Sequence, residues 1–217
     1  LHEQFFPFDF PPLEELECAT YYQPAKKIGG DFYNVLKMDN RLVFYVVDVT
    51  GHALDGAMLN IFIRGTIDSF LFFDNSSQND LSPSEIMRFI LNEFQKEDFP
   101  ADYFICLVVG VLNLNTKELE LSNAGIQVPP LIVSKTGAVK TIESADLPIS
   151  AVIQMKKYQF KDQIIQLQPG DTLFLTTDGL IEEDISGEKF GQDRLEEIIS
   201  NKYYLDSDFM LNEIINN

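Results

Sequence analysis

The stretch "VFYVVDVTGHALDGAML", residues 43–59, decides the architecture of this chain. It begins as an apolar run typical of a buried strand, and this run ends on Asp48. A Thr-Gly-His turn follows, and from Ala53 onwards the apolar residues repeat with helical spacing. The stretch therefore predicts a strand that carries a carboxylate to the rim of a sheet and leads directly into a helix.

The neighbouring segments extend this pattern. Residues 32–38 and 41–47 are predicted strands joined by Asp39-Asn40, a hairpin signal. The helix is expected over residues 53–72, and its apolar side chains include Leu54, Met58, Ile61 and Phe62 on one face. Ser82-Pro83-Ser84-Glu85 is a capping box with proline at the first helical position, so a second helix is expected to run to Lys96.

The rest of the chain reads as further strands and two final helices. Residues 103–112 are nearly all apolar, as in a central strand buried on both faces. Strands that pair as hairpins are antiparallel. The predicted fold class is therefore α+β, a four-layer αββα sandwich of two antiparallel β-sheets flanked by helices. The other predicted strands are 15–23, 118–122, 131–134, 139–142, 158–167 and 172–177, and the final helices are 193–200 and 208–215.

The composition excludes several classes of protein. The chain has 16 Lys and Arg against 34 Asp and Glu, a formal net charge of −18, which argues against nucleic-acid and anionic-membrane partners. No apolar run approaches the roughly 20 residues of a membrane span, and the N-terminus shows no signal-peptide pattern. Cys18 and Cys106 lie far apart in apolar contexts, which indicates buried reduced thiols and a cytoplasmic location. Residues 1–13 are predicted to be a lead-in, and the lack of an initial Met predicts that the chain is a piece of a longer protein.

Three aspartates occupy the same kind of position, at a predicted strand end beside glycine. Asp31 follows Gly-Gly, Asp48 precedes Thr-Gly-His, and Asp178 precedes Gly. Three carboxylates that converge need cations to stay ionised, and Mg²⁺ or Mn²⁺ takes such oxygen ligands. Zinc is disfavoured, because His and Cys ligands at suitable spacing are missing. From spacing alone, a metal site and ordinary Asp-Gly turns remain two open interpretations.

Five motifs occur in order along the chain: "PAKKIGGDFYNV", "VVDVTGHALDGAML", "LSNAGIQVPPLIV", "LPIS", and "QPGDTLFLTTDGLIEE" followed by "FGQDRL". Together they resemble the metal-dependent PP2C-type serine/threonine phosphatases of bacteria, in the SpoIIE/RsbU branch, over about residues 15–195. The resemblance implies an αββα fold in a domain spanning residues 14–217. It also implies hydrolysis of phosphoserine or phosphothreonine on a regulatory protein, by water activated between two Mn²⁺ or Mg²⁺ ions.

The resemblance also assigns catalytic and metal-binding roles at the matching positions. Asp48 matches the aspartate that bridges the two metals, and the backbone carbonyl of Val49 matches the one that completes the first metal site. Asp178 matches the second-site ligand of the T-D-G motif. Asp31 matches the aspartate of the G-G-D motif, which holds metal directly or through water.

Two candidate substrate-binding residues lie beside these ligands. Lys27, next to Lys26, is a cation near the G-G-D motif and is a candidate to meet phosphate. His52 is a candidate to orient water or to protonate the leaving serine oxygen. A solvated loop charge for the lysines and a turn-packing or capping role for the histidine are the open alternatives.

Departures from the family pattern leave two other functions open. Ile126-Gln127 stands where the family has the histidine of N-A-G-H, so Asn123 and Gly125 are expected to form only a structural turn. The strand with D-D-x-T, whose aspartate adds a metal ligand, is expected to be lacking before Asn217. The alternatives are a catalytically weak or inactive PP2C-like regulatory domain and a hydrolase of small phosphoesters.

The resemblance further implies a set of partners. The substrate would be a phosphorylated regulatory protein, such as an anti-sigma-factor antagonist, and an upstream sensor or receiver domain would control the enzyme. Residues 70–73 make the far end of the first helix unusually apolar, which suggests a homodimer or domain contact. Burial against the second helix through Phe89 and Phe94 is the alternative.

Overall fold

The computed structural model describes residues 13, 16–24, 29–50, 54–74, 81–143, 146–153 and 158–216. These residues form two compact units. The first unit comprises the described parts of residues 24–126 and 144–166, and the second comprises those of residues 9–23, 127–143 and 167–217. The predictions for residues 1–12 of the lead-in, for Lys26 and Lys27, and for His52 lie outside the described residues.

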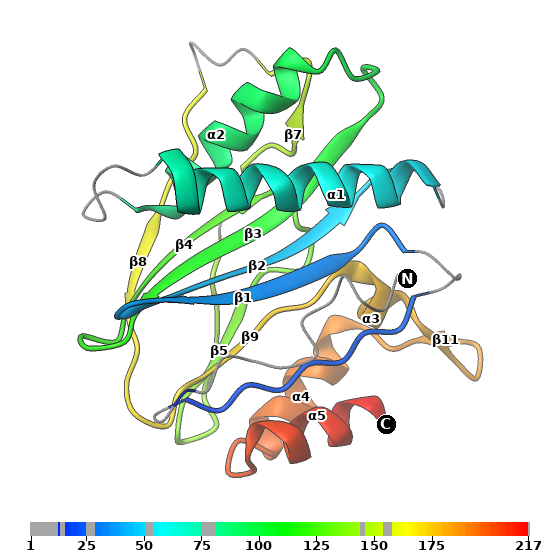
Figure 1. Cartoon of the computed structure of the whole chain (residues 1–217). Coiled ribbons are helices and arrows are strands. Elements are labelled where there is room, and N and C mark those ends of the chain that lie inside the picture. The colour runs from blue at the N-terminus through cyan, green and yellow to red at the C-terminus, as the bar shows by residue number, and fades with distance from the viewer. Residues whose placement is uncertain are drawn as a thin grey trace. The chain divides into compact units, whose positions relative to one another are not determined.

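The first unit is built on one antiparallel sheet with the strand order β1-β2-β3-β4-β8, and β7 pairs with the start of β3 (Figure 1). The central strand is β3, and its residues 105–112 are all buried, as its apolar run predicts. The strands are β1 (Phe32–Met38), β2 (Arg41–Val49), β3 (Phe104–Asn113), β4 (Glu118–Ala124), β7 (Ile149–Ser150) and β8 (Gln163–Gln166).

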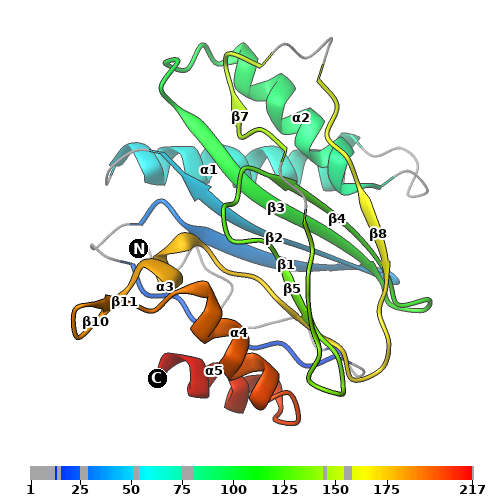
Figure 2. The same cartoon turned by 180° about the vertical axis from the view of Figure 1, so that it is seen from behind.

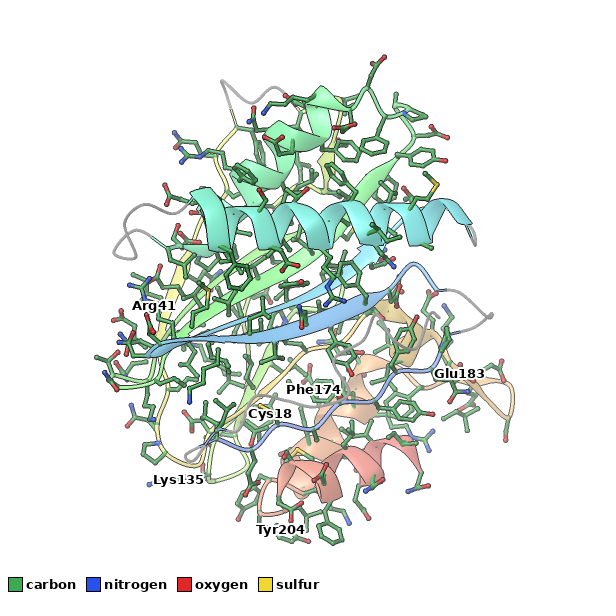
Figure 3. All side chains as sticks on the ribbon, viewed as in Figure 1. Cys18, Arg41, Lys135, Phe174, Glu183 and Tyr204 are labelled. Carbon is green, nitrogen blue, oxygen red and sulfur yellow. The ribbon has the colours of Figure 1, made fainter. Side chains whose placement is uncertain are left out.

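The predicted hairpin is the edge of this sheet. Asp39 in its turn has a φ of 52°, in the left-handed region that Asp and Asn tolerate better than most residues. The register pairs Met38 with Arg41 and Phe32 with Val47. Arg41 marks the turn end of the hairpin in Figure 3. The start of β1, the end of β2 and the N-terminal end of α1 lie at the other end of the sheet (Figure 1).

Two helices, α1 (Leu54–Ser69) and α2 (Pro83–Lys96), cover one face of this sheet, and both lie behind it in Figure 2. The face of α1 that packs on the sheet is offset from the one predicted, because Met58 and Ile61 are 62% and 57% exposed. The helix is apolar on most sides, so its periodicity alone did not select the buried face. The residues that the two helices bury in the core are Leu59, Ile63 and Ile67 of α1 and Ile86, Met87, Ile90, Leu91 and Phe94 of α2.

The aromatic end of α1 continues as a π-helical segment, η2 (Phe70–Asp74). Phe70 packs against Phe89 of α2, with ring centroids 5.2 Å apart. Phe62 packs edge-on against Phe94 at 6.2 Å. Burial against the second helix therefore accounts for part of the apolar cluster, whereas Phe72 remains 60% exposed.

The start of α2 is fixed by two caps. As the capping box predicts, Ser82 Oγ accepts a hydrogen bond from the Glu85 amide at 3.3 Å. Asp162, just before β8, accepts from the Ser84 amide at 2.8 Å and from the Ser122 hydroxyl of β4 at 3.1 Å. Asp162 therefore links α2 to the sheet.

A second carboxylate, Glu120 on β4, makes stability depend on pH. Burial raises the pKa of the Glu120 carboxyl, the charge of Asp162 raises it further, and Arg41 opposes both. The folded state therefore holds this proton more tightly than the unfolded state, so ionisation lowers stability as pH rises through the raised pKa. Glu120→Gln is expected to raise the free energy of unfolding at neutral pH and to leave it unchanged at acidic pH.

Urea unfolding midpoints at acidic and neutral pH measure this effect. Glu188→Gln, at an exposed position outside this sheet, is the control and is expected to change neither midpoint. If the two variants behaved alike at neutral pH, burial of Glu120 would not be the cause.

The second unit contains a three-stranded antiparallel sheet, in the order β6-β5-β9, covered by two helices (Figure 2). Leu131 and Val133 of β5 pack in one core with Leu195 and Ile199 of α4 and with Met210 of α5. The elements are β5 (Leu131–Val133), β6 (Val139–Thr141), β9 (Thr172–Phe174), α3 (Asp178–Glu182), β10 (Asp184–Ile185), β11 (Glu188–Lys189), α4 (Gln192–Asn201) and α5 (Ser207–Ile215).

Two strand predictions need correction. The described part of the predicted strand 15–23 belongs to no strand, because residues 16–24 alternate in polarity without joining a sheet. The predicted strand 158–167 is reduced to β8, of four residues. Among the helices that the structure describes, none is both long enough and apolar enough to cross a membrane.

Candidate metal centre

Asp31 and Asp48 lie opposite each other at the open end of the β1–β2 hairpin. The paired register ends with Phe32 opposite Val47, and the approach of Gly30 to the Val49 carbonyl continues the same register beyond it. Asp31 and Asp48 lie between these two facing pairs, and we infer that they are opposite each other. Opposed residues project from the same side of a sheet, with Cβ atoms about 5 Å apart. Val47 and Val49 belong to the core beneath the helices, so both carboxylates project from the opposite face. Two carboxylates this close favour a cation between them.

The carbonyl of Val49 lies against Gly30, immediately beside this pair. A Cβ atom built on Gly30 would stand 2.7 Å from the Val49 oxygen, which is closer than real Cβ contacts allow. Only glycine permits this approach of the two backbones. The G-G-D motif therefore needs its second glycine for a steric reason, and the carbonyl and both carboxylates share one end of the hairpin.

Thr50 anchors the strand end that carries Asp48. Its amide donates to the Phe104 carbonyl at 3.1 Å, and its Oγ1 accepts from the Phe104 amide at 2.8 Å. Both bonds go to Phe104 of β3, so they hold the strand end against β3 directly after Val49. Sequence reasoning treated Thr50 only as part of a turn, and the anchoring role of its side chain was missed.

Asp178 belongs to the second unit, and its local setting differs from the prediction. The strand β9 ends at Phe174, and Asp178 is the first residue of α3, after Thr177 at the N-cap. The expectation that Asp178 ends a strand is therefore wrong. A carboxylate at the first position of a helix is locally favourable, because it faces the positive end of the helix dipole.

The structure also describes Asn123, of the N-A-G motif, and Cys106. Asn123 is buried, donating through Nδ2 to the Ile126 carbonyl at 3.1 Å and accepting from the Ile126 amide at 2.9 Å. This is the structural turn expected at the N-A-G motif. Cys106 lies opposite Asp48 on β3 and is buried, as predicted, and it forms no disulfide. Cys18 was also predicted to be buried, but it is only half-buried.

The donors at this end of the first unit suit a hard divalent cation. They are two carboxylates and a backbone carbonyl, the oxygen ligands that Mg²⁺ and Mn²⁺ prefer. Within the described ranges, no group of three or more His, Cys, Asp or Glu side chains is arranged to hold a metal ion. Asp31, Asp48 and the Val49 carbonyl are therefore candidate ligands contributed by the first unit, and Asp178 is a candidate contributed by the second.

Solved structures identify the fold. The SiaA-PP2C domain of Pseudomonas aeruginosa matches 90% of this chain and 74% of that chain with a TM-score of 0.73 at 18% identity. RsbX in complex with magnesium matches 88% of this chain and 79% of that chain with a TM-score of 0.62 at 14% identity. The chain therefore has a PP2C-like α+β fold with antiparallel sheets and helices, which confirms the predicted class.

Sequence comparison then identifies the family. The family described as Stage II sporulation protein E (SpoIIE) matches residues 38–217, so this chain belongs to the SpoIIE family of PP2C-like serine phosphatases. Phosphoserine phosphatase RsbU of Bacillus subtilis (strain 168) is 23% identical over 172 residues, which are 79% of this chain and 48% of the relative. The resemblance predicted from the five motifs is confirmed, and the chain spans about half the length of this relative.

Proposed function

We propose that this chain is a metal-dependent protein serine/threonine phosphatase that hydrolyses phosphoserine or phosphothreonine on a regulatory protein. The observation that carries the proposal is the opposed pair Asp31–Asp48 beside the Val49 carbonyl, in a chain of the SpoIIE family. The name of the RsbU relative, a phosphoserine phosphatase, supports the same chemistry.

In this proposal Asp31, Asp48, the Val49 carbonyl and Asp178 hold two Mn²⁺ or Mg²⁺ ions. Such cations would supply an activated water and charge stabilisation for the attacking and leaving oxygens. Asp48 would be a ligand of both ions, and the hydrogen bonds of Thr50 hold its strand end against β3. Asp31 and Asp178 contribute further negative charge. The RsbX structure with magnesium supports a hard cation in this fold.

Substrate contacts are proposed for two residues. Lys27 attracts the phosphate group, and His52 protonates the leaving serine oxygen. The chain as a whole carries a formal charge of −18. A phosphate group therefore approaches only where local cations make the electrostatic potential positive. A lysine beside the G-G-D motif supplies such a charge.

We further propose a cytoplasmic signalling role for the domain. Its substrate is a phosphorylated regulatory protein, such as an anti-sigma-factor antagonist, and an upstream sensor or receiver domain controls it. A homodimer or domain contact through α1 is supported by the exposure of Met58, Ile61 and Phe72, three large apolar side chains on α1 and η2.

A catalytically weak or inactive PP2C-like regulatory domain is the second candidate function. The observation that favours it is that no three-ligand cluster of His, Cys, Asp and Glu occurs in the part of the chain that the structure describes. Such a domain would bind its partner protein without hydrolysing it.

Phosphatase assays with metal and with chelator separate these candidates. Hydrolysis of an aryl phosphate is expected with Mn²⁺, is lost when a chelator removes the metal, and returns with excess Mn²⁺. A serine phosphopeptide is expected to be cleaved in preference to a nucleotide, and the reverse preference would favour a small-phosphoester hydrolase. Failure to hydrolyse any of these substrates, in a chain that still binds Mn²⁺, would favour the regulatory domain.

A further inference from the structure

One polar side chain of α1 contacts the loop that carries Asp31. Asn60 Nδ2 donates to the Gly29 carbonyl with a distance of 3.4 Å, across a separation of 31 residues in sequence. Gly29 precedes Gly30, which packs on the Val49 carbonyl, and Asp31, which lies opposite Asp48. The contact therefore joins α1 to the candidate metal centre through one backbone carbonyl.

Folding stability alone does not explain an asparagine at position 60. Its Oδ1 atom is fully buried and has no hydrogen-bond partner among the described residues. A buried polar atom without a partner carries its full desolvation cost, and the one hydrogen bond of the same side chain offsets only part of it. Side chains that break such rules are found most often at functional sites.

The geometry points to Asn60 as a positioning residue, which holds the Gly29 carbonyl so that Gly30 and Asp31 stay in register with Val49 and Asp48. Residue 31 lies just outside β1, at the point where the paired part of the hairpin ends. The amide of Asn60 adds a restraint to this segment from the helix side. This inference rests on the proposed function, because the restraint matters only if these oxygens bind metal.

Asn60→Leu tests the inference, since leucine keeps the branched shape and removes both the donor and the orphaned oxygen. The melting temperature of the metal-free variant is expected to equal or exceed that of the wild type. Its Mn²⁺ dissociation constant, measured by calorimetry, is expected to rise about tenfold. This is the low end of the loss of metal affinity seen when a residue that supports a metal ligand is replaced. A residue with a purely structural role would give the opposite pattern, a lower melting temperature with unchanged Mn²⁺ affinity.

Two further variants complete the experiment. Asn60→Ala removes the same donor without adding bulk and is expected to weaken Mn²⁺ binding similarly. Asn92→Ala is the matched control, because Asn92 lies on α2 and its amide donates to Glu93 of the same helix at 3.2 Å. Its Mn²⁺ affinity is expected to equal that of the wild type.

The outcomes separate this inference from the proposed function. If the wild type binds Mn²⁺ and both Asn60 variants bind it equally well, the positioning role is overturned and the phosphatase proposal stands. Loss of the fold in both Asn60 variants would make the residue structural and would also overturn the inference. A wild-type chain that binds no Mn²⁺ would overturn both proposals.

Discussion

Asp48→Asn is expected to lower Mn²⁺-dependent phosphatase activity by more than about 100-fold. Loss of a residue that only supports a metal ligand costs up to about 100-fold, and loss of a ligand should cost more. The substitution keeps the size of the side chain and removes the charge that, in the proposed mechanism, bridges two cations. The fold is expected to survive, because the repulsion between Asp48 and Asp31 disappears with that charge. The melting temperature of the metal-free variant should therefore equal or exceed that of the wild type.

Asp39→Asn is the matched control for this experiment. Asp39 lies in the same hairpin at its turn end, with a φ of 52° that asparagine also accepts. Its activity is expected to equal that of the wild type. Turnover of Asp48→Asn within a few-fold of this control would remove Asp48 from the mechanism.

Gly30→Ala is the second substitution with a large expected effect. The new Cβ would stand 2.7 Å from the Val49 oxygen, so one of the two backbones must move. Either movement shifts the Val49 carbonyl or turns Asp31 away from Asp48. We expect the Mn²⁺ affinity and kcat/KM to fall by about 10–100-fold, while far-UV circular dichroism stays unchanged.

Gly65→Ala provides the comparison. Gly65 lies within α1, and a Cβ there meets no heavy atom within 4 Å. Alanine in a helix interior stabilises it by about 1 kcal/mol relative to glycine, so this variant should melt higher and retain full activity. Wild-type Mn²⁺ affinity in Gly30→Ala would show that the close approach of Gly30 to Val49 has no part in metal binding.

The features predicted best from sequence are those fixed by local chemistry. Asp39-Asn40 specifies a turn, the turn sets the register, and the register brings Asp31 opposite Asp48. Ser82 and Glu85 specify the start of α2 in the same way. Half of the candidate site therefore follows from a short stretch of sequence.

The features that were missed depend on contacts between distant segments. Because α1 is apolar on most sides, only packing on the sheet distinguishes Leu59 from the exposed Met58. The five-residue helix α3 is too short for periodicity to reveal, so Asp178 was expected at a strand end. The contact between Asn60 and Gly29 joins positions that no local rule relates.

The central claim is that Asp31, Asp48 and Asp178 bind the same pair of cations. Crystals of the wild-type chain grown with Mn²⁺, measured at the manganese absorption edge, test this claim directly, because anomalous difference peaks locate each metal ion. We predict two peaks about 3.5–4 Å apart, with Asp48 between them and with Asp31, the Val49 carbonyl and Asp178 among the oxygens around them. Peaks that lie away from Asp48, or a structure in which Asp178 lies far from both ions, would contradict the account.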